Sequence, residues 1–91
     1  MRFRSRKMEA TYRKRRELVK RMLMDFPACE RCDAARSTDV HEVVSRARGG
    51  SILDPNNLVA LCRACHIFIT ENPEIAHDQG WSKHSWEHDD E

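Results

Sequence analysis

The sequence lacks long apolar runs, and its 91 residues include only three glycines and three prolines. The longest apolar stretches are a few residues long, which argues against a membrane-spanning helix. Internal repeats and low-complexity linkers are also absent, so we expect one small domain. A chain of this length buries too little apolar surface to be comfortably stable through its core alone. We therefore expect a further stabilising element.

The first residues also lack the pattern of a secretory signal. The stretch from Met1 to Lys7 is basic and does not lead into an apolar segment, unlike a signal peptide. We therefore expect a cytoplasmic location and no membrane partner. In a reducing cytoplasm, paired cysteines bind a metal more often than they form disulfides.

Charge is divided unevenly along the chain, although the net charge is only +1. Residues 1–24 hold ten of the 16 Lys and Arg and two of the 15 acidic residues, a net charge of +8. The remainder holds six basic and 13 acidic residues, a net charge of −7. This asymmetry predicts that the N-terminal segment contacts an anionic polymer.

Helical periodicity predicts an α-helix over roughly residues 8–25, which Pro27 should end. Tyr12, Val19 and Leu23 share its apolar face. The other faces carry basic side chains, for which we predict contacts with nucleic-acid phosphates: Arg13, Lys14, Arg16 and Lys20. The alternative is a solvated helix that only packs on the domain.

The remaining pattern predicts a small α+β fold. In chain order it indicates a strand over 38–44, a turn at 49–51, a return strand over 58–61 and a helix over 63–71. Asn72 and Pro73 predict the start of another helix, and Gly80 its end. Trp81 and Trp86 are expected to cover apolar surface. The predicted parts are a basic N-terminal helix (1–26), a central core (27–72), and a C-terminal helix with an acidic tail (73–91).

Two Cys-x-x-Cys pairs, Cys29 with Cys32 and Cys62 with Cys65, are separated by 29 residues. Each spacing lets one tight turn present two thiolates to a tetrahedral ion, so the pairs predict a structural zinc site with four sulfur ligands. A thioredoxin-type redox pair is the alternative for one pair alone. A closed four-thiolate site leaves no position open for substrate.

The segment "DVHEVVSRARGGSILDPNNLVALCRACH" resembles the core of the HNH endonucleases. The resemblance extends over about residues 29–71 and is especially close to small HNH proteins of tailed bacteriophages. It implies a ββα-metal finger, in which a β-hairpin and a helix hold a divalent cation, Mg²⁺ or Mn²⁺, that assists hydrolysis of DNA phosphodiester bonds. By the same resemblance, His66 corresponds to the metal-binding histidine. Asn57 corresponds to the asparagine that braces the hairpin and orients the catalytic base.

The strand position departs from the family pattern. Most relatives have Asp-His or His-His there, with the base seven residues before the first glycine of the pair. Counting back from Gly49 places Glu42 at the base and His41 at the metal. In the other interpretation His41 is the base, as suits an imidazole near neutral pH, and Glu42 or Glu71 supplies an oxygen to the ion. The third ligand also stays open.

Arg46 and Arg48 follow the predicted catalytic strand, where their guanidinium groups could grip DNA phosphates. Solvated loop charges are the alternative. Gly49 and Gly50 supply backbone conformations that other residues resist.

The resulting hypothesis is a metal-dependent DNA endonuclease that nicks or cuts duplex DNA with little sequence preference of its own. Phage HNH proteins of this size can assist the terminase during DNA packaging, so the resemblance implies terminase and portal proteins as partners and the bacterial host cytoplasm as location. Two alternatives are a non-catalytic zinc-knuckle module that binds DNA and a protein-docking domain. The oligomeric state is not predicted.

Overall fold

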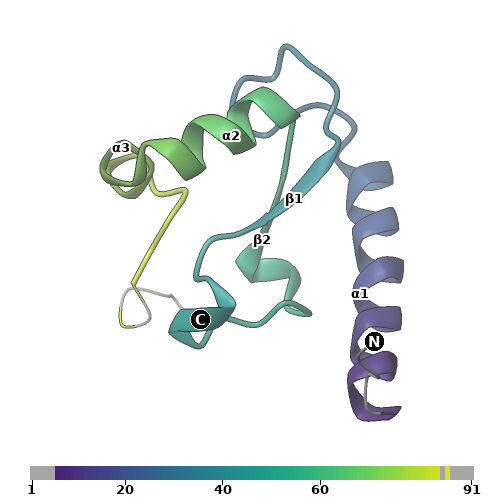
Figure 1. Ribbon diagram of the computed structural model, residues 1–91. Helices are drawn as coiled ribbons and strands as arrows, with labels where there is room; N and C mark the ends of the chain where they lie inside the picture. Colours follow the sequence, from purple (N-terminus) through teal and green to yellow (C-terminus); the bar gives the residue numbers. More distant parts are fainter. Residues whose placement is uncertain (1–5, 85, 87–91) are drawn as a thin grey trace.

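The computed structural model describes residues 6–84 and 86, and the acidic tail expected at residues 87–91 lies outside them. Its elements follow the predicted order of helix, hairpin and helices (Figure 1). They are α1 (Arg6–Asp25), β1 (Asp39–Glu42), the 3₁₀ turns η1 (Arg46–Arg48) and η2 (Pro55–Asn57), β2 (Leu58–Leu61), α2 (Arg63–Glu71) and α3 (Pro73–Asp78). The predicted small α+β class is confirmed. No helix in the described part of the chain is long and apolar enough to cross a membrane.

Helix α1 is amphipathic and docks through the apolar face predicted from its sequence. Met22 is buried, and Leu18, Val19 and Leu23 are half-buried. The helix ends at Asp25, two residues before Pro27, and the Phe26 N–H still donates to the Met22 carbonyl at 2.8 Å. This end follows from the missing donor and the restricted backbone that proline imposes.

The two strands form an antiparallel hairpin in which His41 pairs with Val59 and Glu42 with Leu58. The return strand has its predicted bounds, whereas β1 is shorter than the predicted 38–44. After Glu42 the Val43 N–H still donates to the Asn57 carbonyl at 2.9 Å, but the amide of Val44 donates to the Asn57 side chain at 2.8 Å instead of to a backbone carbonyl. Side chains alternate along β1, so Asp39 and His41 share one face and Glu42 lies on the other.

Helices α2 and α3 follow the hairpin directly. Cys62 is the N-cap of α2, and its sulfur accepts the Cys65 N–H. Asn72 lies at the predicted N-cap position of α3, but its side chain donates to the Phe68 carbonyl of α2 rather than capping α3. Gly80 follows α3 with φ +84°, a left-handed conformation that glycine adopts at little cost.

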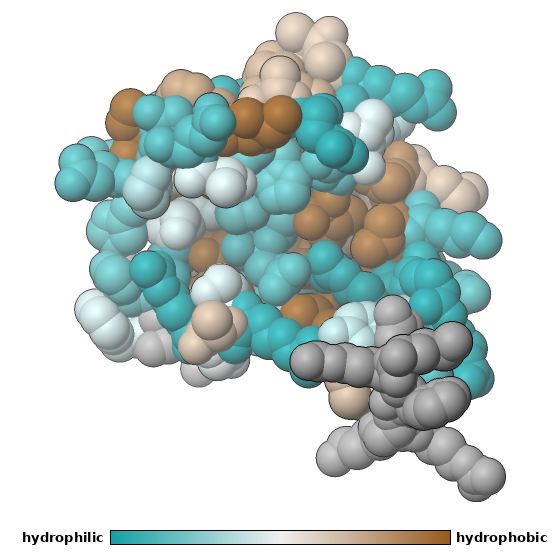
Figure 2. Space-filling model, in the orientation of Figure 1, coloured by the Kyte–Doolittle hydropathy of each residue, from teal (hydrophilic) through white to brown (hydrophobic). Residues whose placement is uncertain are grey.

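The hydrophobic core is small and is built around the cysteines. Its main cluster of buried side chains comprises Cys29, Leu61, Cys62, Cys65, Ile69 and Ala76. Val59 and Trp81 pack against this cluster, whereas Trp86 is 79% exposed and does not cover apolar surface as expected. Hydrophilic side chains cover most of the face shown in Figure 2, with apolar surface in separate patches. A core with so few buried side chains is consistent with the expectation that the fold needs an additional stabilising element.

Candidate functional site

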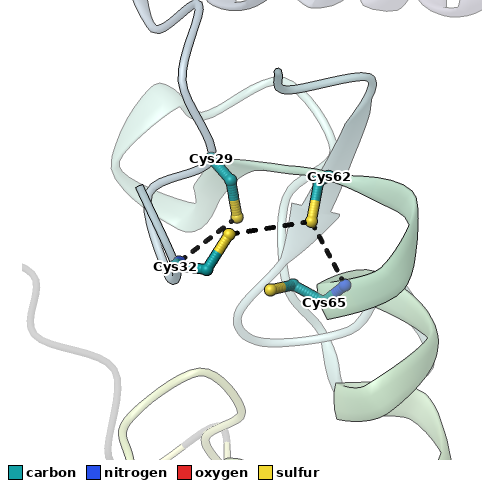
Figure 3. A group of neighbouring side chains, drawn as sticks. All are labelled: Cys29, Cys32, Cys62 and Cys65. Carbon is teal, nitrogen blue, oxygen red and sulfur yellow. Dashed lines mark hydrogen bonds between the residues drawn. The ribbon is translucent and has the colours of Figure 1, made fainter. Parts of the chain in front are cut away.

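The four predicted cysteine ligands converge in one place (Figure 3). Cys29 and Cys32 come from the loop between α1 and β1, and Cys62 and Cys65 from the start of α2. All four sulfur atoms lie within 4.8 Å of one another, and those of Cys32 and Cys62 are 4.0 Å apart. Sulfurs bound to one tetrahedral zinc ion are about 3.8 Å apart. The spacing therefore suits zinc and is too long for a disulfide.

Each sulfur accepts at least one N–H hydrogen bond. Backbone donors serve Cys29, Cys32 and Cys62 at 3.4–3.5 Å. The sulfur of Cys65 accepts from the Arg31 guanidinium at 3.4 Å, and that guanidinium also lies over the Phe68 ring. Donors of this kind stabilise thiolates, the form in which cysteine binds metal.

Burial opposes thiolate formation in the same cluster. It acts to raise the pKa of Cys29, but backbone N–H groups of Cys32, Cys62 and Arg31 outweigh it and lower this pKa to about 6. Burial raises the pKa of Cys65 to about 12. A cation among the sulfurs would stabilise the thiolate at Cys65 as well, so the donor set fits a structural zinc ion.

The second group of chemistry-bearing side chains lies between β1 and α2. Asp39 Oδ2 accepts from His66 Nδ1 at 2.8 Å and forms an ion pair with Arg63, whose Nε lies 2.9 Å away. The hydrogen bond to Asp39 fixes the His66 ring with Nε2 directed elsewhere. A carboxylate that accepts one ring N–H is the usual orienting partner of a metal-binding histidine.

His41 lies on the same face of β1, next to His66. The two ring centroids are 5.4 Å apart, in an edge-to-face arrangement. His41 Nε2 is 2.7 Å from the carbonyl oxygen of Trp81, in the segment after α3. Within residues 6–84 and 86, no hydrogen bond is seen to Nδ1 of His41.

Charge in this group suits proton transfer near neutral pH. Burial lowers the pKa of His41 below its usual value, and the neighbouring His66 acts in the same direction. For Asp39, burial acts to raise the pKa, but hydrogen bonds from His66 and Thr38 and the charge of Arg63 outweigh it and lower the value. At pH 7, His41 is therefore neutral and Asp39 is ionised.

Glu42 is directed toward α1 and not toward His66. Its Oε2 lies 3.3 Å from Nη2 of Arg15, whose Nη1 donates to the Ile52 carbonyl at 2.8 Å. The Glu42 and Arg15 side chains are 26% and 17% exposed. Two adjacent residues of β1 thus have different partners, because a strand directs successive side chains to opposite faces.

Asn57 is buried and braces the chain between the two strands. Its Oδ1 accepts from the Val44 N–H at 2.8 Å, and its Nδ2 donates to the carbonyls of Val44 and Ser51 at 2.9 Å. Gly50 lies against the same place: a Cβ there would be 1.8 Å from the Val44 oxygen. The glycine is therefore required for close approach of two backbone segments.

Comparison with known protein families finds a match that includes most of these residues. Residues 29–70 match the HNH endonuclease family model. The match contains both Cys-x-x-Cys pairs, β1, β2 and His66, and we refer to it below as the HNH segment. Neither the curated proteins nor the solved structures include a match to the chain.

The predicted phosphate-binding residues lie on α1 and on the turn after β1. The four basic residues predicted on α1 are all exposed: Arg13, Lys14, Arg16 and Lys20. Arg46 and Arg48, both exposed, belong to η1 in the HNH segment. Nη1 of Arg46 donates to the Tyr12 hydroxyl at 3.0 Å. Arg48 lines a surface hollow together with residues of α3, among them His77.

Three residues of this region were not predicted from the sequence to take part in the site. Asp39 could have been found, because it lies two residues before His41 and strand alternation puts both on one face. Arg15 could also have been found, because it lies three residues after Tyr12 and four before Val19, on the apolar face predicted for the helix. Trp81 contributes a backbone carbonyl from outside the HNH segment, for which sequence carries no signal.

In the described part of the chain, no group of three or more His, Cys, Asp or Glu side chains other than the cysteines is gathered closely enough to hold an ion. Of the side chains predicted as further ligands, His41 lies next to His66, whereas Glu42 faces α1. The Thr70 hydroxyl donates to the His66 carbonyl, within its own helix. Asp39, Glu71 and His66 line one surface hollow.

Proposed function

We propose that the protein is a divalent-metal-dependent endonuclease that hydrolyses phosphodiester bonds of DNA. The observation that carries this proposal is the gathering of Asp39, His41 and His66 on one face of the hairpin, inside the HNH segment. A zinc site and a DNA-binding surface alone would require none of these three side chains.

His41 is the proposed general base. Its Nδ1 offers a lone pair on a neutral imidazole, because Nε2 is engaged with the Trp81 carbonyl. Accepting a proton from the attacking water there would supply the general-base help that hydrolysis of a phosphodiester needs. Glu42 suits this role less well, since its carboxylate is paired with Arg15 on the opposite face of β1.

His66 is the proposed ligand of the catalytic ion, Mg²⁺ or Mn²⁺. Asp39 holds its Nδ1, which leaves Nε2 to bind a cation. One histidine is a sparse protein donor set, and it suits an ion that keeps several waters in its coordination shell. A divalent ion bound there supplies charge to neutralise the phosphate and to stabilise the departing oxygen.

DNA affinity is assigned to the exposed cations of α1 and η1. The residues proposed to contact phosphates are Arg13, Lys14, Arg16, Lys20, Arg46 and Arg48. Contacts to phosphate position the duplex without reading its sequence, so we expect little sequence preference. Asn57 has an indirect part, because it holds the loop that carries Arg46 and Arg48.

Incubation of the zinc-loaded protein with supercoiled plasmid, with and without added Mg²⁺ or Mn²⁺, tests the proposal. The wild type should nick or linearise the plasmid only when the divalent ion is present. His41→Ala and His66→Ala should both be inactive while they retain their zinc and their fold. DNA binding without cleavage under every metal condition would instead identify a non-catalytic zinc-knuckle module.

The resemblance to small phage HNH proteins extends the proposal to a setting. We expect the protein to act on DNA during packaging, in contact with terminase and portal proteins in the host cytoplasm. Co-purification with a terminase and stimulation of its DNA cleavage would support this setting. Cleavage that is unaffected by any terminase would remove the setting and leave the nuclease proposal intact.

A further inference from the structure

We propose that the segment after α3 is a positioning element of the active site, in which the Trp81 carbonyl fixes the tautomer and orientation of His41. The inference rests on the proposed function only in giving His41 a part in cleavage. Trp81 lies 11 residues beyond the end of the HNH segment at residue 70. The proposed element is therefore an addition to the matched segment.

Two hydrogen bonds join this segment to the catalytic strand. His41 Nε2 lies 2.7 Å from the Trp81 carbonyl oxygen, and the Lys83 N–H donates to the Val43 carbonyl at 2.9 Å. The two contacts are two residues apart in each segment: residue 41 meets residue 81, and residue 43 meets residue 83. Residues 81–83 thus run beside the end of β1 and its continuation, next to the side chain that they hold.

The contact determines which ring nitrogen carries the proton. A carbonyl oxygen can only accept, so Nε2 of His41 must be the donor and carry the hydrogen. In the neutral ring, Nδ1 then has the lone pair. Whether Nδ1 takes a proton from water or binds an ion, it must be unprotonated, and of the two neutral tautomers the Trp81 carbonyl favours the one in which Nδ1 has no proton.

The carbonyl is held in place by the core. The Trp81 side chain is half-buried and packs against the cluster that contains the four cysteines. Its N–H donates to the Ala76 carbonyl at 2.9 Å, at the end of α3. Trp81 thus contacts the core around the cysteines through its side chain and His41 through its carbonyl.

Two matched substitutions at Lys83 separate positioning from packing, since neither touches the core. Lys83→Pro removes the N–H that donates to Val43, whereas Lys83→Ala keeps that N–H and removes the side-chain charge. Trp81→Ala and Trp81→Phe form a second pair, in which phenylalanine keeps an aromatic ring against the core. Nitrogen-15 NMR of the full-length, zinc-loaded protein would report the tautomer of His41, and plasmid cleavage would give kcat and KM.

We expect a single Nε2–H tautomer of His41 in the wild type, in Lys83→Ala and in Trp81→Phe. Lys83→Pro and Trp81→Ala should give a mixture of tautomers. Their kcat should fall by ~10- to 100-fold, the usual effect of losing the partner that orients a catalytic or metal-binding histidine. Their KM for DNA and their zinc content should stay unchanged.

An unaltered tautomer in a folded, zinc-loaded Lys83→Pro protein would overturn the inference, whatever its activity. A loss of kcat in Lys83→Ala equal to that in Lys83→Pro would also overturn it, because the side-chain charge would then be the cause. If the tautomer changes as expected but the wild type cleaves no DNA, the inference stands and the proposed nuclease function fails.

Discussion

The two faces of β1 carry different side chains, because successive residues of this four-residue strand point to opposite sides. On the face toward α2, Asp39 holds His66 and Arg63, and His41 lies 5.4 Å from His66 between ring centroids. On the face toward α1, Glu42 pairs with Arg15. One face presents imidazole nitrogens, and the other joins the basic helix to the hairpin.

This difference teaches how one short strand can serve two tasks. A strand only four residues long cannot bury a site deeply, so each face depends on the helix packed against it. The cysteine cluster supports the face toward α2, because Cys62 and Cys65 begin that helix. The face toward α1 depends on the docking of that helix, to which the buried Met22 and the hydrogen bond from Arg15 to the Ile52 carbonyl contribute.

Loss of the cysteine cluster should unfold the domain and so disrupt the side-chain contacts on both faces of β1. Cys62→Ser should lower zinc content from one per chain and remove cooperative unfolding, since metal binding and folding are coupled in small zinc domains, with binding free energies of about 10–16 kcal/mol. Metal analysis and thermal unfolding by circular dichroism measure these effects. Ile69→Val, in the same core cluster, is the control and should cost only about 0.5–1.5 kcal/mol. A fully folded, zinc-free wild type would contradict the expectation.

Substitution at His66 should eliminate the function of one face and leave the other intact. His66→Ala should abolish plasmid cleavage, because the variant has no side chain at the position of the proposed ligand, while the cysteine-bound zinc is retained. Thr70→Ala, one turn further along α2, should cleave at close to the wild-type rate, since the Thr70 hydroxyl bonds within its own helix. Equal activity in both variants would remove His66 from the site.

Neutralising the exposed face of α1 should weaken DNA binding with little change in kcat. Replacing Arg13, Lys14, Arg16 and Lys20 with Gln should reduce the slope of log affinity against log salt by about 0.9 for each DNA phosphate that the helix no longer neutralises. This change is preferable to deleting residues 1–24, because the deletion would also remove the buried Met22. Glu17→Gln, on the same helix, is the control. An unchanged slope would mean that α1 only packs.

Glu42→Gln should have the smallest effect and decides between the two candidate bases. With His41 as the base, cleavage should stay within a few-fold of the wild type. Stability should fall by at most about 1 kcal/mol, as for partly exposed ion pairs. Arg15→Gln should lower stability at least as far, because it also removes the donor to the Ile52 carbonyl. Single-turnover cleavage measures the rate, and urea unfolding measures the stability. A rate loss of ~10²–10⁴ with unchanged metal dependence would instead make Glu42 the base. Partial rescue by excess metal would make it a ligand.

Several features of the protein were determined by local sequence. The bounds of β2 and α2 agree with prediction, because the apolar run over 58–61 and the Cys62 N-cap act within a few residues. The paired Cys-x-x-Cys spacing likewise predicted the cluster, since each pair is presented by a single turn. The HNH resemblance located its segment to within one residue at the C-terminal end, residue 70 against the expected 71.

Only the tertiary structure decided which neighbours the candidate residues have. His41 and Glu42 are adjacent in sequence and were equivalent candidates, but α2 packs on one face of β1 and α1 contacts the other. Helical spacing puts Arg15 on the apolar face of α1, but its partners there, Glu42 and the Ile52 carbonyl, follow only from the packing of the helix on the domain. The Trp81 carbonyl reaches His41 across 40 residues of sequence. A backbone acceptor is present at every residue, so its use depends on packing alone.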